Sequence, residues 1–123
     1  MTKPESIIID EVEYIREDLN NIASPVNGMK YCVVRTISAG VHIGYVKEFG
    51  EKHHMHAFLI NSRRLHYWNK AASLSQVAID GVCPVTSRIA MKVPEIELTE
   101  VIEVIPCSKK ALDFFENAKV WKI

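Results

Sequence analysis

Apolar side chains recur at helical spacing near the start of the chain. Over residues 5–22 they are separated by four, three, four and three positions, which leaves one apolar stripe along a helix. The stripe consists of Ile8, Val12, Ile15, Leu19 and Ile22. We therefore predict an N-terminal amphipathic helix within residues 1–25. This helix either covers the sheet of its own chain or packs against another subunit, and its place outside the β-rich body favours the second arrangement.

The pattern changes after the turn signal Asn27-Gly28 to the alternation that is typical of strands. Residues 49–52 fit a hairpin loop within this region. The predicted strands are residues 29–38, 41–49, 53–60, 63–68 and 96–105.

Two short helices are indicated among and after these strands. Ser73 fits an N-cap for a helix over residues 73–80, which Gly81 ends. Ser108 fits the N-cap of a C-terminal helix whose apolar side contains Phe115. The order of elements predicts an α+β fold with a bent, mainly antiparallel sheet, an N-terminal amphipathic helix, a short central helix and a C-terminal helix. Residues 26–123 form the single ligand-binding domain in this prediction.

The composition indicates the compartment in which the protein is expected. No stretch approaches the roughly 20 apolar residues that span a bilayer, and the first residues do not resemble a signal peptide. Three scattered cysteines (Cys32, Cys83 and Cys107) lack CxxC spacing, which favours reduced thiols. We expect a cytoplasmic protein that has no contact with a membrane.

A net charge of +0 conceals a segregation along the chain. Residues 1–24 hold two basic and six acidic groups, residues 25–92 hold nine and three, and residues 93–123 hold four and six. A protein that grips long nucleic acid is usually basic overall, so this distribution fits a compact site for a small anion better. The alternative is that lysine-rich sheet edges and glutamate-rich helices produce this distribution by chance.

Catalytic and metal motifs are missing from the sequence. His54 and His56 would share a strand face, but no HExxH motif accompanies them, and a solvated edge strand explains them better than zinc. Cys32 and Cys107 lie beside apolar residues and are predicted to be buried. There is no nucleophile elbow and no phosphate-binding glycine loop. We predict no enzyme activity, no catalytic residues, no metal and no cofactor.

A binding constellation remains, most of it in residues 61–76. Arginine forks match paired phosphate oxygens, and aromatic rings offer surfaces for base stacking. Arg63 and Arg64 are strand neighbours that point to opposite faces, so one of them faces a given pocket. For each arginine the simpler alternative is a surface ion pair, and for Tyr67 or Trp68 it is core packing.

The motifs that carry a resemblance are Arg35-Thr-x-Ser-Ala-Gly-Val-His42-x-Gly44, Arg63-Arg-x-x-Tyr-Trp68-x-x-Ala-Ala-x-Leu-Ser-Gln76 and Leu98-Thr-Glu-Val-Ile-Glu-x-Ile-Pro106. Over residues 29–122 the chain resembles a family of small bacteriophage and prophage proteins that includes the Thoeris anti-defence sponge. The candidate ligand-binding residues are the motif positions Arg35, Ser38, Gly40, His42, Arg63, Arg64, Tyr67, Trp68, Ala72, Ser73, Leu74, Ser75 and Gln76.

The resemblance implies a protein that sequesters the cyclic ADP-ribose isomer made by a TIR-domain immune enzyme. It also implies a homo-oligomer, from dimer to hexamer, and a second class of site for cyclic oligonucleotides. The motifs that carry the resemblance do not include the residues around 50–60, so their histidines receive no role. We expect Arg35, His42 and Arg64 to contact phosphates, Tyr67 or Trp68 to stack on adenine, and the backbone amides of residues 73–75 to bind phosphate or ribose.

Two alternatives stay open. An RNA or single-stranded nucleic-acid binding module would use the same basic, aromatic centre. An enzyme that degrades a cyclic nucleotide would need a general base or a metal, for which the sequence has no motif.

Overall fold

The computed structural model describes residues 22–49, 56–68 and 71–121. The elements, in chain order, are β1 (Lys30–Thr36), β2 (Val41–Phe49), β3 (Ala57–Tyr67), α2 (Leu74–Asp80), β4 (Arg88–Ile89), β5 (Val93–Leu98), β6 (Val101–Pro106) and α3 (Lys109–Asn117). The predicted α+β class is confirmed. Residues 1–21, which hold most of the predicted N-terminal helix, and the loop after Phe49 fall outside the described residues. Residues 22–25 are not helical as the prediction allowed, because Ile22 pairs with Ser108 in an antiparallel bridge.

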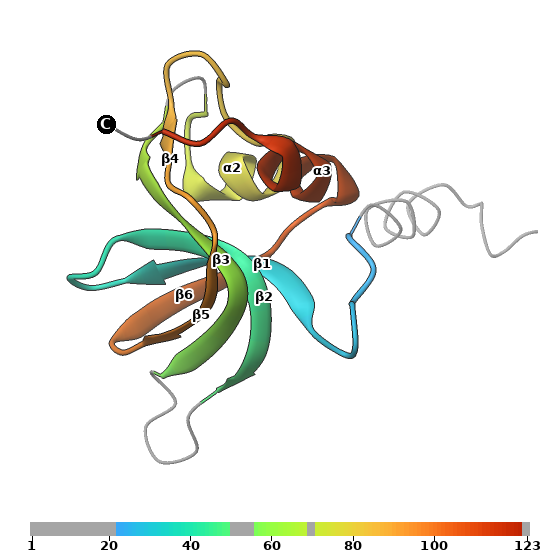
Figure 1. Ribbon diagram of the computed structural model, residues 1–123, viewed down its shortest axis with the longest axis vertical. Coiled ribbons are helices and arrows are strands. Elements are labelled where there is room, and N and C mark those ends of the chain that lie inside the picture. The colour runs from blue at the N-terminus through green and yellow to red at the C-terminus, as the bar shows by residue number, and fades with distance from the viewer. Residues whose placement is uncertain (1–21, 50–55, 69–70, 122–123) are drawn as a thin grey trace, which may run out of the picture.

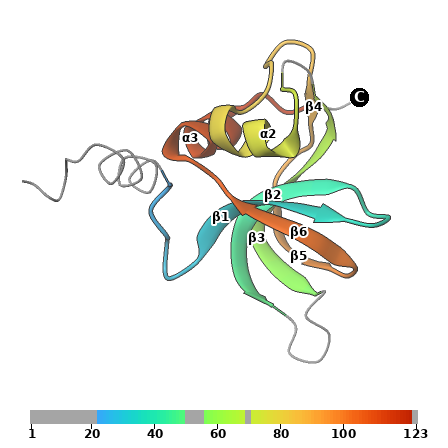
Figure 2. The same ribbon diagram turned by 180° about the vertical axis from the view of Figure 1, so that it is seen from behind.

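One six-stranded sheet organises the molecule, and every strand pairing in it is antiparallel. Its order is β4-β3-β2-β1-β6, and β5 pairs with β3. The short corner Thr99-Glu100 therefore joins one strand at the β3 side to another at the β1 side, which curls the sheet strongly (Figures 1 and 2). The curl gives the sheet an inner face and an outer face.

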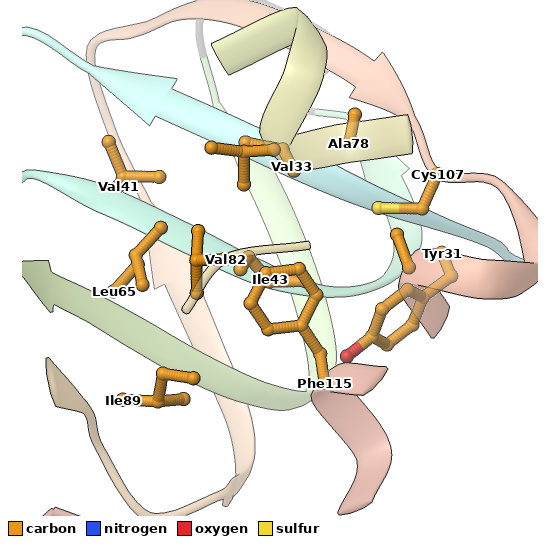
Figure 3. Packing of buried hydrophobic residues seen from close by; sticks show 12 residues of the cluster. Tyr31, Val33, Val41, Ile43, Leu65, Ala78, Val82, Ile89, Cys107 and Phe115 are labelled. Carbon is orange, nitrogen blue, oxygen red and sulfur yellow. The ribbon is translucent and has the colours of Figure 1, made fainter. Parts of the chain in front are cut away.

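Helices α2 and α3 lie together on the outer face (Figure 1). Between them and the sheet is the larger apolar core, which Figure 3 shows and to which strands β1 to β4 and both helices contribute. Its members include Tyr31, Ile43, Leu65, Val77 and Phe115. Burial of these side chains holds the helices on the sheet, since each helix alone is too short to be stable in water.

The inner face carries a second, smaller core. Cys32, Val34, Val46, Leu59 and Leu98 are buried there. Alternation explains the division, because Tyr31 and Val33 point to the outer core while Cys32 and Val34 between them point to the inner one.

Local capping signals fix both helices as predicted. Ser73 Oγ accepts from the Gln76 amide (3.3 Å), and Gly81 ends α2 with φ 80°. Ser108 Oγ accepts from the Ala111 amide (3.0 Å) at the start of α3, while the same hydroxyl donates to the Ile79 carbonyl (2.6 Å). Ser108 thus starts one helix and ties it to the end of the other.

The strands differ from the prediction in three main ways, besides shifts of a few residues at other strand ends. Residues 57–67 form one strand, because Asn61 adopts φ 52° in a bulge and does not end the strand. The stretch 96–105 is split into β5 and β6 at Glu100, whose φ is 59°. The two-residue strand β4 was not predicted, since its length gives no periodic signal.

The segregated charges meet as ion pairs across the fold. Arg35 pairs with Glu103 (3.8 Å), Lys47 with Glu95 (3.6 Å) and Lys92 with Glu116 (2.7 Å). In each pair a basic group of the central region faces an acidic group of the C-terminal third. Three of the nine basic groups of the central region are therefore paired, and the basic groups without such a partner become the informative ones.

Candidate functional site

A pocket of about 290 Å³ opens on the inner face of the sheet, beyond the end of the inner core. Its polar side consists of His42 from β2 and of Ser62, Arg64 and His66 from β3. Ala90, Met91, Val93 and Ile96 form its apolar side. The volume lies near the lower end of the range for small-molecule sites, and the lining combines an apolar wall with a few convergent polar groups.

His42 is fixed at the floor of this pocket. It is 1% exposed, and Nε2–H donates to the Ala39 carbonyl (3.0 Å), because a carbonyl oxygen can only accept. Burial lowers the pKa of His42, and the charge of nearby Arg64 lowers it further. The imidazole is therefore neutral near pH 7 and leaves Nδ1 as a hydrogen-bond acceptor.

Ser62 adds a buried hydroxyl that has no hydrogen-bond partner among the described residues. Its position depends on the bulge in β3, where Asn61 and Ser62 together oppose Gly44 of β2. A Cβ on residue 44 would lie 2.9 Å from the Ser62 Cα, so only glycine permits this approach. An unpaired buried hydroxyl is costly, which makes Ser62 Oγ a natural contact for a polar ligand.

Arg64 stands at the mouth of the pocket, opposite His42 in the pairing of β2 and β3. Its side chain is exposed, and within the described ranges no carboxylate pairs with it. A guanidinium in this position presents a planar set of donors to an incoming anion.

Arg63 points to the other face of the sheet and is 1% exposed. Its Nε donates to the Ala90 carbonyl (2.8 Å), and its Nη1 donates to the carbonyls of Phe115 (2.7 Å) and Ala118 (2.9 Å). Burial lowers its pKa, yet the cation remains because three carbonyls and the C-terminal end of α3 stabilise it. The structure thus places Arg63 outside the pocket, as a clamp on the end of α3.

The hairpin between β1 and β2 holds three other predicted site residues. Arg35 is paired with Glu103, and Ser38 Oγ donates to Glu100 Oε1 (2.7 Å). Gly40 has φ 87° and its carbonyl accepts from Thr36 Oγ1 (2.8 Å). These groups shape the loop that carries Ala39, the partner of His42, but none of them lines the pocket.

The remaining predicted residues, from Tyr67 at the end of β3 onward, do not line the pocket. Trp68, together with Leu74, packs against the outer core, whereas Tyr67 is 50% exposed. Around the start of α2 the polar groups bond to one another: Gln76 Oε1 accepts from the Ala72 amide (2.8 Å), and Ser73 caps the helix. Ser75 is exposed. His42 and Arg64 are the two predicted residues that line the pocket.

Sequence reasoning missed Ser62 and the apolar wall from β4 to β5, and it left His66 out of the site although His66 shares the strand face of Arg64. Serine and histidine at strand positions give no signal by themselves, although Ser62 and His66 have the same parity as Arg64 along β3. That parity was the available clue.

A second cavity, of about 410 Å³, lies at the other end of β1 and β2 and is lined in part by Lys30, Cys32, Lys47 and Pro106. Although this cavity is larger, it offers fewer groups that could bind or react with a ligand. Lys47 is paired with Glu95, and burial raises the pKa of Cys32 to about 11, so the thiol stays protonated. We therefore take the His42–Arg64 pocket as the candidate site.

Among the residues that the structure describes, no three histidine, cysteine, aspartate or glutamate side chains gather as a metal site. In the same part of the chain, neither helix is long and apolar enough to cross a membrane.

The part of the chain that forms the pocket matches a known sequence family. A family model described as Domain of unknown function (DUF6948) matches residues 29–115. The chain belongs to this family. The DUF6948 match runs from just before β1 into α3, so the DUF6948 region includes His42, Ser62, Arg64 and His66. No curated protein and no solved structure matches the sequence.

Proposed function

We propose that this chain is a phage-encoded sponge that binds a cyclic nucleotide signal in the bacterial cytoplasm and holds it without cleaving it. The proposed ligands are those implied by the motif resemblance: cyclic ADP-ribose isomers made by TIR-domain enzymes and, as a second class, cyclic oligonucleotides. The observation that carries the proposal is the Arg64 guanidinium, which faces a pocket without a carboxylate partner among the described residues.

Three further features support an anionic ligand with an apolar part. Ser62 Oγ is buried without a partner in the described chain, and the neutral His42 ring offers an acceptor for a ribose hydroxyl. Opposite them, the wall from Ala90 to Ile96 suits a flat, apolar surface. Binding at the nanomolar level corresponds to roughly −12 kcal/mol, which requires most of a small ligand to be buried.

The properties of the cysteine thiols favour a protein that binds its ligand over one that cleaves it. Burial raises the pKa of Cys107 to about 12 and that of Cys32 to about 11, so neither thiol is a good nucleophile near pH 7. Neither thiol lines the pocket, and no aspartate or glutamate is among its lining residues. A ligand bound in this pocket thus meets donors and acceptors that position it.

A homo-oligomer, from dimer to hexamer, is part of the proposal. The predicted apolar stripe reaches Ile22, which in the described part of the chain pairs with Ser108 in an antiparallel bridge and is 39% exposed. An exposed apolar side chain at the end of such a stripe is available for a contact between subunits.

Native mass spectrometry tests the proposal directly. The full-length protein is measured alone and with cyclic ADP-ribose isomers, cyclic di- and trinucleotides, and oligonucleotides of increasing length. A defined oligomer that gains integral numbers of intact ligands would support the sponge. Affinity that rises with oligonucleotide length and falls steeply with salt would indicate a nucleic-acid binding module, and recovery of cleaved ligand would indicate an enzyme.

The variant Arg64→Met locates the site, with Arg35→Met as its matched control. Both arginines are exposed strand residues, but Arg35 is paired with Glu103 and lies outside the pocket. We expect Arg64→Met to weaken binding at least about tenfold, because a charge-assisted bond to phosphate is lost. Arg35→Met should change it less than about threefold. Equal effects of the two substitutions would remove the pocket from the proposal.

A further inference from the structure

Beside the pocket, three side chains from distant parts of the chain form a cation–aromatic cluster. The Arg88 guanidinium lies over the Trp121 ring (5.3 Å to its centroid) and over the Tyr67 ring (5.9 Å). Tyr67 is 50% exposed and Trp121 is 40% exposed, so both rings keep open surface. Exposed aromatic rings held in place by an arginine are suited to base stacking.

This cluster is continuous with the pocket. His66, which lines the pocket, has its ring 5.3 Å from that of Trp121. Ile89 is buried in the outer core, so alternation in β4 sends Arg88 to the side of Ala90, another pocket residue. The Trp121 amide donates to the Ile89 carbonyl (2.9 Å), which holds the C-terminal segment against β4 beside this opening.

This surface differs from the rest of the described chain in that its arginines have no carboxylate partner. Arg35 is paired with Glu103, and Arg63 is buried with backbone carbonyls. Arg64 and Arg88 have no carboxylate partner among the described residues, and both stand at the pocket and its rim. Unneutralised guanidinium groups next to open aromatic rings fit a ligand that carries both a phosphate and a base.

We propose that Tyr67, Arg88 and Trp121 form the base-binding half of the His42–Arg64 pocket. The ligand is then a nucleotide whose phosphate contacts Arg64 near Ser62 and whose base stacks on the cluster, on the far side of His66. This assignment rests on the proposed function, because it requires a phosphorylated ligand in the pocket. It moves the stacking role from Trp68, which packs on the outer core, to Trp121.

Calorimetry with AMP and ribose 5-phosphate, which differ by the base alone, tests the assignment on the full-length protein. We expect AMP to bind at least about fivefold more tightly, the lower limit for one stacked base. The variant Trp121→Leu should remove this advantage and leave ribose 5-phosphate binding unchanged. Val120→Ala, on the same segment but outside the cluster, serves as the matched control and should behave like the wild type.

A second readout follows from the tryptophan count of two. In Trp68→Phe the emission comes from Trp121 alone, and saturating AMP should quench it while ribose 5-phosphate should not. Equal binding of both compounds, with no quenching, would overturn the base-binding half and leave the phosphate pocket standing. Failure of both compounds and of every cyclic nucleotide to bind would overturn the proposed function itself. Affinity for oligothymidine that grows with length would reassign the cluster to single-stranded nucleic acid. The calorimetric comparison retains Trp68 and does not depend on this variant.

Discussion

The two faces of the curled sheet treat neighbouring residues of one strand in opposite ways. On the outer face, Arg63 is buried and bonds to three backbone carbonyls under α3. On the inner face, Arg64 is exposed, unpaired within the described residues, and stands over a pocket. Of two adjacent arginines, one therefore stabilises the fold on the outer face and the other is available for binding on the inner face. Residue type alone does not assign a role, because the strand alternates between two environments.

Removing Arg63 should have the largest effect on stability. In Arg63→Met the carbonyls of Ala90, Phe115 and Ala118 lose their donor, and at ~1–3 kcal/mol for each unpaired group we expect a loss of about 3 kcal/mol or more. Urea unfolding measures this loss. Arg64→Met should stay within about 0.5 kcal/mol of the wild type, as an exposed substitution does. Comparable losses in the two variants would erase the contrast between the faces.

Gly44→Ala should come next. The added Cβ would lie 2.9 Å from Ser62 Cα and 3.1 Å from the Ile60 carbonyl oxygen, so the backbone of β2 or β3 has to shift. Overpacking of this kind costs about 1–3 kcal/mol, and thermal unfolding should report it.

Ser62→Ala is the control for Gly44→Ala, since it removes the hydroxyl from the pocket without adding volume. The Oγ has no partner in the described structure, so the stability of this variant should be unchanged or slightly higher. A stable Gly44→Ala protein would show that the bulge tolerates a side chain.

Acidification should affect the inner face through His42. Its pKa is lowered by burial, so the folded state binds its proton less readily than the unfolded chain does. The stability from the neutral ring is therefore complete above pH 6.5, the ordinary pKa, and declines as the pH falls through that value and below. We expect the free energy of unfolding to fall less between pH 7 and pH 5 in His42→Gln, which keeps a donor for the Ala39 carbonyl. Parallel pH profiles for the two proteins would rule out this role for His42.

The smallest expected effect concerns the thiols, one on each side of the sheet. Cys32 belongs to the inner core and Cys107 to the outer core, and both have raised pKa values because of burial. At pH 8 a disulfide reagent should modify Cys83, which is partly exposed, and should reach the other two only on unfolding. Rapid modification of Cys32 in the folded protein would show that the inner core opens.

Local signals in the sequence predicted the parts of this fold that depend on local physics. The caps Ser73, Gly81 and Ser108 mark helix ends because each satisfies or permits a backbone geometry within a few residues of itself. The strand Val41–Phe49 was predicted with its observed bounds. Burial of Cys32 and Cys107, predicted from their apolar neighbours, is confirmed.

Elements that depend on pairing with distant strands were predicted less well. The sequence predicted separate strands over residues 53–60 and 63–68, but pairing with β2 and β5 carries β3 through Asn61 as a bulge. At Glu100 the apolar alternation continues through the corner, so no local signal separated β5 from β6. In both cases the energy of long-range pairing outweighed the local preference.

For the candidate site, the sequence by itself determined which chemical groups are present: arginines, histidines and aromatic rings in one central region, apart from most of the acidic residues. Only the tertiary structure decided which of them meet. It separates Arg63 from Arg64, directs Trp68 to the core, pairs Arg35 with Glu103, and brings Arg88 and Trp121 to the rim of the pocket. The physical reason is that side-chain direction follows from strand parity, whereas proximity between distant segments follows from how the sheet curls, which no local pattern encodes.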